Sequence, residues 1–169
     1  MSEWFKGFLS GVIATIIGCV ITMVWDIFKS KRETKERENK VLLVIKEDLT
    51  CNLRILYDNF ELIKQELEII DSGRSIINSL IPLKIGFWDL AKIHLPKKIL
   101  QGDTLAKLRD VVMNTERINE TIQSRENFRN HNRALTGYAQ QMKSYDNLLV
   151  DHIKCMLNLT KEVSSFLKD

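Results

Sequence analysis

Two basic side chains in the second half of the chain have the types and spacing of a site that acts on phosphate. Arg125 and His131 are separated by five residues, giving the pattern R-x5-H, and Arg129 and Arg133 lie close by. A guanidinium can hold a phosphate group, and an imidazole can move a proton near neutral pH. Such groups serve metal-independent RNA cleavage. The same basic turn is also typical of a solvated connection between helices, touching RNA, lipid headgroups or a neighbouring subunit.

A degenerate version of this pattern lies further on, where Asn147 and His152 are separated by four residues. Its alternative interpretation is a half-buried histidine beside Ile153. The three histidines are far apart, and the one His–Cys pair at helical spacing, His152 with Cys155, has no second pair to complete a metal site. We therefore expect no metal ion and no cofactor, and the sequence leaves catalysis open.

The elements that must position these residues are predicted to be helices. Between Lys29 and Asp71 there is no proline or glycine, and apolar residues recur every three or four positions from Leu42 to Ile70. This pattern predicts one long amphipathic helix that ends at Ser72-Gly73, and it allows this helix to be continuous with the segment before it. Asn52 lies in the apolar register of this helix.

The rest of the chain is also predicted to be mainly helical. Residues 74–103 are irregular, with Phe87-Trp88 expected to plug one end of the core or to line a pocket. Asp103 can cap a helix whose apolar face fades into the polar segment 124–133, a turn or an extended helix end. A last helix is predicted from about residue 134 to 167. Residues 41–169 are thus expected to form an all-α bundle.

An uncharged stretch at the N-terminus is long enough to cross a membrane. Gly7 to Trp25 are 19 residues without a charge, which rise about 28 Å as a helix. We therefore predict a single transmembrane helix over residues 4–28. A cleaved signal peptide would have a shorter apolar run and a small-residue cleavage site, and a lipoprotein signal ending at Cys19 would be followed by polar residues.

Charge around this stretch predicts its orientation. Six basic residues fall within 29–40, which we predict to be a basic helical stalk, while only Lys6 precedes the uncharged stretch. The positive-inside rule then places the N-terminus outside and the C-terminal domain in the cytoplasm. The net charge of +3 is too small to argue for nucleic acid by itself. Three scattered cysteines fit free thiols in a reducing compartment.

Small residues form a stripe along one face of the predicted span. Glycines let a neighbouring helix approach closely, and threonines can hydrogen-bond across the interface. The stripe therefore predicts a homo-oligomer in the bilayer. If the helices enclose a lumen, Thr15 and Thr22 could line it. The alternative is that glycine is simply common in membrane helices. The residues of the stripe are Gly7, Gly11, Ala14, Thr15, Gly18 and Thr22.

The combination of one span, a basic stalk, an all-α domain and an R-x5-H pattern resembles the small membrane accessory proteins of type VI-B CRISPR-Cas systems. The resemblance covers nearly the whole chain in organisation. That family carries a divergent HEPN-type motif, whose matching positions would be Arg125 and His131, or less directly Asn147 and His152. Glu126 stands where the motif usually has a polar amide-type residue, and the second pair lacks the arginine, so the match is incomplete.

The resemblance implies a HEPN-like domain at residues 41–169 and a ring-like oligomer in the bacterial inner membrane. Such a ring would form a pore and depolarise the membrane once an RNA-guided nuclease effector, its expected partner, is activated in antiviral defence. Two alternatives stay open. One is a membrane-tethered HEPN-type ribonuclease, and the other is a non-catalytic, membrane-anchored helical adaptor.

Overall fold

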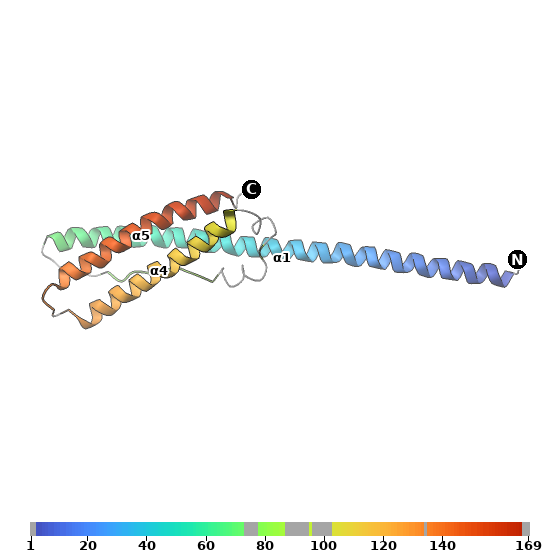
Figure 1. Cartoon of the computed structure of the whole chain (residues 1–169), viewed down its shortest axis with the longest axis horizontal. Coiled ribbons are helices and arrows are strands. Elements are labelled where there is room, and N and C mark those ends of the chain that lie inside the picture. Colours follow the sequence, from blue (N-terminus) through green and yellow to red (C-terminus); the bar gives the residue numbers. More distant parts are fainter. Residues whose placement is uncertain (1–2, 73–77, 87–94, 96–102, 134, 167–169) are drawn as a thin grey trace. The chain divides into compact units, whose positions relative to one another are not determined.

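A computed structural model describes residues 3–72, 78–86, 95, 103–133 and 135–166; of these, the side chains of 3–10, 12–14 and 166 are not described. Within these ranges the protein is helical and has no β-strand (Figure 1). The predicted all-α fold class is confirmed. The helices are α1 (Glu3–Asp71), α4 (Asp103–His131) and α5 (Tyr138–Phe166).

Helix α1 is continuous over the predicted span, the stalk and the first amphipathic segment. It ends where the hydroxyl of Ser72 donates a hydrogen bond of 2.7 Å to the carbonyl of Ile69, which satisfies one of the last orphan carbonyls. By its internal contacts the chain divides into two compact units, Met1–Lys40 and Val41–Asp169. The two units are described separately below.

The first unit is a single stretch of helix. Its described apolar side chains between Ile16 and Phe28 are largely exposed, and in the stalk Arg32 pairs with Glu36 at 3.0 Å. Within the described residues, no helix is long and apolar enough to cross a membrane. The side chains of 4–10 and 12–14, which belong to the predicted span, lie outside the described ones.

The second unit packs three helices around one core, and each helix buries a face with alternating steps of three and four residues. This spacing keeps one stripe of a helix against its neighbours and is the geometry of left-handed bundles. The core also includes Leu80 and Leu83 from the segment between α1 and α4. The buried positions that follow this spacing are Val41, Ile45, Leu49, Asn52, Leu56, Asn59, Ile63 and Glu66 in α1, Leu108, Val111, Thr115, Ile118, Ile122 and Arg125 in α4, and Met142, Asp146, Leu149, Ile153, Met156, Thr160 and Val163 in α5; Val112 and Thr121 widen the buried face of α4.

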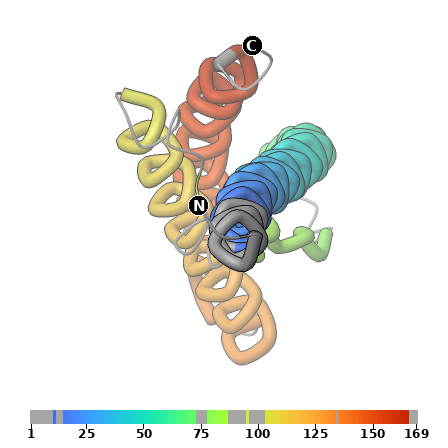
Figure 2. Tube along the Cα trace, turned by 90° about the vertical axis from the view of Figure 1, so that its right-hand side faces the viewer, coloured from blue at the N-terminus to red at the C-terminus, as the bar shows by residue number. Residues whose placement is uncertain are grey.

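Helices α4 and α5 lie side by side (Figure 2), and a short turn joins them at one end (Figure 1). In this turn the amide of Leu135 bonds to the carbonyl of Asn132 at 3.0 Å, and the amide of Tyr138 to that of Leu135 at 3.1 Å. Gly137 has a φ of 86°, a left-handed conformation that residues with a Cβ rarely adopt. The ring of Phe128 stacks on that of Tyr138 at 5.6 Å and packs the helix ends together.

The structure decides between the alternatives for one predicted boundary and shifts another. Of the two alternatives for the polar segment 124–133, the extended helix end is confirmed, because α4 continues through it to His131. The last helix begins at Tyr138 rather than near residue 134. Helix α4 extends further because Arg125 takes a buried position in the same register as the apolar residues before it. The predicted aromatic plug at Phe87-Trp88 lies outside the described residues.

Candidate functional site

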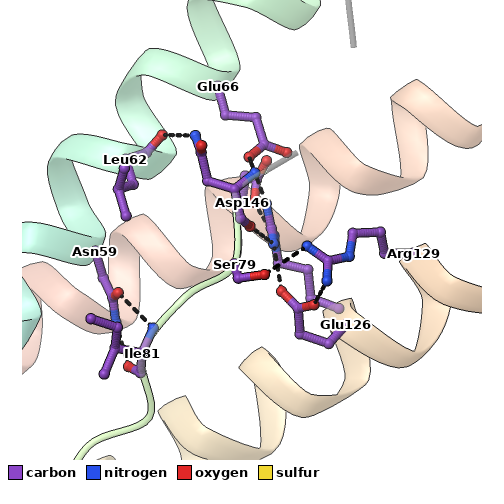
Figure 3. Close-up of polar contacts among 10 residues, drawn as sticks. Asn59, Leu62, Glu66, Ser79, Ile81, Glu126, Arg129 and Asp146 are labelled. Atoms are coloured by element: carbon purple, nitrogen blue, oxygen red, sulfur yellow. Dashed lines mark hydrogen bonds and ion pairs between the residues drawn. The ribbon is translucent and has the colours of Figure 1, made fainter. Parts of the chain in front are cut away.

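Arg125 is the centre of a buried polar cluster that joins all three helices of the second unit. Its Nε lies 2.7 Å from Asp146 Oδ1, and its Nη2 lies 2.8 Å from Glu66 Oε2. Its Nη1 donates to the backbone carbonyl of Asn78 at 3.0 Å and approaches Glu126 Oε1 at 3.2 Å. We call Arg125, Glu66 and Asp146 the arginine cluster; Figure 3 shows the region around it.

The helical register brings these three charges together. Each one continues the buried 3-4 stripe of its own helix, so each is carried into the core at the same end of the bundle. The side chains of all three are fully enclosed, with 0% exposure. Glu126 and Arg129, which pair with each other beside the cluster, keep 21% and 15% exposure.

Burial controls the acid–base chemistry of the two carboxyl groups. It raises the pKa of Glu66 above its ordinary value of 4.5, against the lowering effects of the Asn78 amide and of Arg125. It also raises the pKa of Asp146 above 3.8, again against the lowering effect of Arg125. A guanidinium held by two carboxylates and a carbonyl, out of contact with water, is not available to bind a phosphate group.

A second polar feature runs beside the cluster. The segment 78–86, which we call the strap, passes between α1 and α4 and is held through its backbone by asparagine side chains. Asn59 accepts from the amide of Ile81 at 3.0 Å and donates to its carbonyl at 2.7 Å. Asn52 holds Lys84 in the same way at 2.7 and 2.8 Å. We call these side chains, with Asn119 of α4, the asparagine ladder.

Asn119 completes the ladder from the opposite side of the strap. It accepts from the amide of Leu83 at 2.7 Å and donates to its carbonyl at 2.9 Å. A primary amide offers one acceptor and two donors, so it can satisfy both backbone groups of one residue. The partly buried backbone of the strap therefore needs no β-sheet partner. Pro82, which has no N–H, sits between residues whose amides are used.

The spacing of these contacts fixes the shape of the strap. Contacts of Asn78, Ile81 and Lys84 fall on α1 positions that are seven residues apart: Glu66, Asn59 and Asn52. Fourteen residues of α-helix rise about 21 Å. Six residues of chain cover that distance only when they are almost fully extended, at about 3.5 Å each. The strap is thus an extended chain that runs antiparallel to α1.

The structure separates the first predicted pair of site residues. Arg125 is buried in the arginine cluster, whereas His131 is exposed, with its Nδ1 2.8 Å from the carbonyl oxygen of Asn127. Six residues along a helix place two side chains on different faces. The interpretation of 125–133 as one basic surface turn therefore does not hold for Arg125. Of its neighbours, Arg129 donates to Ser79 Oγ at 3.1 Å and Arg133 is exposed in the turn.

The second predicted pair lies on α5. Asn147 is exposed, next to the buried Asp146. His152 is half-buried, and burial, helped by Arg117, lowers its pKa below the ordinary value of 6.5. Its Nδ1 is enclosed and has no hydrogen-bond partner among the described residues. This environment matches the half-buried alternative for His152.

The small-residue stripe belongs to the first unit. The hydroxyl of Thr15 donates to the carbonyl of Gly11, and that of Thr22 to the carbonyl of Gly18, each at 2.9 Å. A Cβ added at Gly11 or Gly18 would meet nothing within 4 Å. A shallow groove follows the same helix face past Thr15, Gly18 and Thr22. The side chains at Gly7 and Ala14 lie outside the described residues.

Sequence reasoning missed Glu66, Asp146, Asn59 and Asn119. For the first three a signal was present, because each is a polar residue at a position where the 3-4 pattern requires an apolar one. Asn119 gave no such signal, since it lies beside the buried stripe of α4 and is only half-buried. Comparison with protein-family models, with characterised proteins and with solved structures gives no match to this chain.

Proposed function

We propose that this protein is an oligomeric membrane pore whose N-terminal helices associate through the face carrying Gly11, Thr15, Gly18 and Thr22. The observation that carries the proposal is the chemistry of this face. Both threonine hydroxyls already donate to backbone carbonyls of their own helix, so the face can enter an apolar environment without unsatisfied donors. The two glycines leave it open to a neighbouring helix.

The other parts of the proposal rest on the sequence. The stretch Gly7–Trp25 has the length of a span, and the basic stalk at 29–40 orients the helical domain toward the cytoplasm. The role in defence, in which activation of an RNA-guided nuclease opens the pore and depolarises the bacterial inner membrane, rests on the resemblance in organisation alone.

Reconstitution of the full chain in liposomes tests the pore. The current recorded across a patch of these membranes is expected to change in discrete conductance steps when the protein is intact. Gly18→Leu is expected to abolish these steps because the added bulk keeps the helices apart. Val20→Leu is the matched control, since it also enlarges the span but lies toward the other side of the helix. Absence of conductance at every protein concentration, or equal loss in both variants, would overturn the proposal.

A non-catalytic, membrane-anchored adaptor is the second candidate. The observation that favours it is that Arg125, the arginine of the only R-x5-H pair, is enclosed by ion pairs instead of facing a substrate. An adaptor should keep its activity when residues 4–28 are replaced by an unrelated membrane helix, whereas a pore should lose it. For the ribonuclease alternative, His131→Ala is the informative variant, because His131 is exposed and its loss leaves the core intact.

A further inference from the structure

The arginine cluster contains more negative than positive charge in a place that water does not reach. Two carboxyl groups, of Glu66 and Asp146, face one guanidinium, and all three side chains have 0% exposure. With both carboxyls ionised the enclosed cluster would carry one uncompensated negative charge. An unpaired charge in a protein interior is strongly unfavourable. One bound proton would make the cluster neutral.

The carboxyl oxygens show where that proton can be held. Arg125 contacts Glu66 through Oε2 and Asp146 through Oδ1. The second oxygen of each group, Glu66 Oε1 and Asp146 Oδ2, is also enclosed and has no hydrogen-bond partner among the described residues. Each carboxyl therefore has one oxygen fixed by the guanidinium and one oxygen with an unused lone pair.

Among the residues that the structure describes, the groups around the cluster do not supply the missing charge. On α4, Glu126 and Arg129 pair with each other, so together they add none. From the strap, Asn78 presents only its backbone amide and carbonyl. From α5, Tyr138 has an enclosed hydroxyl without a hydrogen-bond partner among the described residues, and burial raises its pKa, so it stays neutral. The charge of Arg133, in the exposed turn, lowers the pKa of Tyr138, but the effect of burial is larger.

We propose that Glu66 and Asp146 together bind one proton at neutral pH, and that this proton holds α1, the strap, α4 and α5 together at the arginine cluster. The ligand is the proton itself, and the site is the pair of enclosed carboxyl oxygens. Release of the proton at alkaline pH leaves an enclosed negative charge and weakens the junction. The proposal does not depend on the pore.

Linkage gives the direction of the effect. Both carboxyl pKa values are raised by burial in the folded protein, from ordinary values of 4.5 and 3.8. The folded chain then binds more protons than the unfolded chain above those values, so the contribution is complete below about pH 4 and is lost as pH rises through the raised pKa. His152 acts in the opposite direction, because its lowered pKa favours unfolding on acidification. Only differences between variants therefore isolate the cluster.

Thermal unfolding of the full chain in detergent between pH 5 and 9 is the first test. Glu66→Gln and Asp146→Asn each replace one acid with an amide of the same shape and leave one carboxylate against Arg125. Near pH 6 each single variant is expected to have the melting temperature of the wild-type protein. From pH 6 to pH 8 the melting temperature of each single variant is expected to fall by less than that of the wild-type protein. The double variant leaves the enclosed cation with only the partly exposed carboxylate of Glu126 and is expected to melt far lower at every pH. The result that overturns the proposal is a large, pH-independent loss in both single variants.

Infrared difference spectroscopy of the wild-type chain is the second measurement, and it does not require a variant to fold. A carbonyl band of a protonated carboxylic acid should be present at pH 7 and should disappear on titration to pH 9. It should also be absent or shifted in Glu66→Gln or Asp146→Asn. Glu126→Gln is the matched control, because this third carboxyl also contacts Arg125 but is partly exposed. Absence of the band in the wild-type protein at pH 7 overturns the proposal.

Discussion

Arg125 illustrates how a single residue can look functional in the sequence and be structural in the fold. Its neighbours in sequence are polar, which suggests a basic surface, but its side chain contacts α1, the strap and α5 at once. A planar guanidinium suits this position because it can donate in several directions in one plane, which a lysine ammonium cannot do.

Replacing Arg125 with methionine should therefore be severe. The change keeps the length of the side chain but leaves two enclosed carboxyls without a cation, and breaking such a buried pair destabilises a protein by about 3–5 kcal/mol. Chemical unfolding of the full chain in detergent measures the loss. Arg109→Met, an exposed arginine on the same helix, should change stability by less than about 0.5 kcal/mol. Equal effects of the two substitutions would contradict the structural role.

At the scale of elements, the strap depends on its neighbours for every backbone partner described here. A strand in a sheet forms backbone hydrogen bonds with its neighbouring strands. In the strap, asparagine side chains of α1 and α4 take the place of these partners. This arrangement lets an extended segment enter a helical core, with Leu80 and Leu83 buried and Lys84 exposed.

Asn59→Leu should release the middle of the strap. The leucine cannot pair with the amide and carbonyl of Ile81, and leaving such groups without partners costs about 1–3 kcal/mol. Hydrogen exchange at the Ile81 amide should accelerate while exchange in the centre of α5 changes less. Asn158→Ala, at an exposed asparagine of α5, is the control and should leave exchange in the strap unchanged. Unchanged protection of Ile81 in Asn59→Leu would rule out the ladder as its source.

At the scale of the whole molecule, the division into two compact units predicts that they are stable separately. Residues 41–169 contain the core, the arginine cluster and the asparagine ladder, so a chain starting at Val41 is expected to fold alone. Its helical circular dichroism and melting temperature should match those of this unit in the full protein. Under the proposed function, oligomers should form only when residues 1–40 are present. An unfolded fragment would show that the first unit is needed for the second.

The sequence was sufficient to predict the helices of the second unit and insufficient to predict their polar contacts. The 3-4 spacing of apolar residues determines which face of a helix is buried, so the all-α class and the approximate helix positions followed. The same spacing contains Glu66, Arg125 and Asp146, yet it cannot say which charges from different helices will meet. The strap has neither helical nor strand periodicity, because its backbone is held by side chains of other elements. No local signal predicts such a segment.

The match between the strap and α1 has a consequence for how this protein can evolve. Three residues of the strap span the same length as two turns of α1. The contacts of Asn78, Ile81 and Lys84 therefore depend more on how many residues separate them than on which residues these are. An insertion or deletion here would displace later backbone groups by about 3.3 Å from their asparagines. Exposed positions of the strap can drift freely in composition. We therefore expect descendants of this chain to differ in the residue types at positions 78–84 and to keep the same number of residues in this segment.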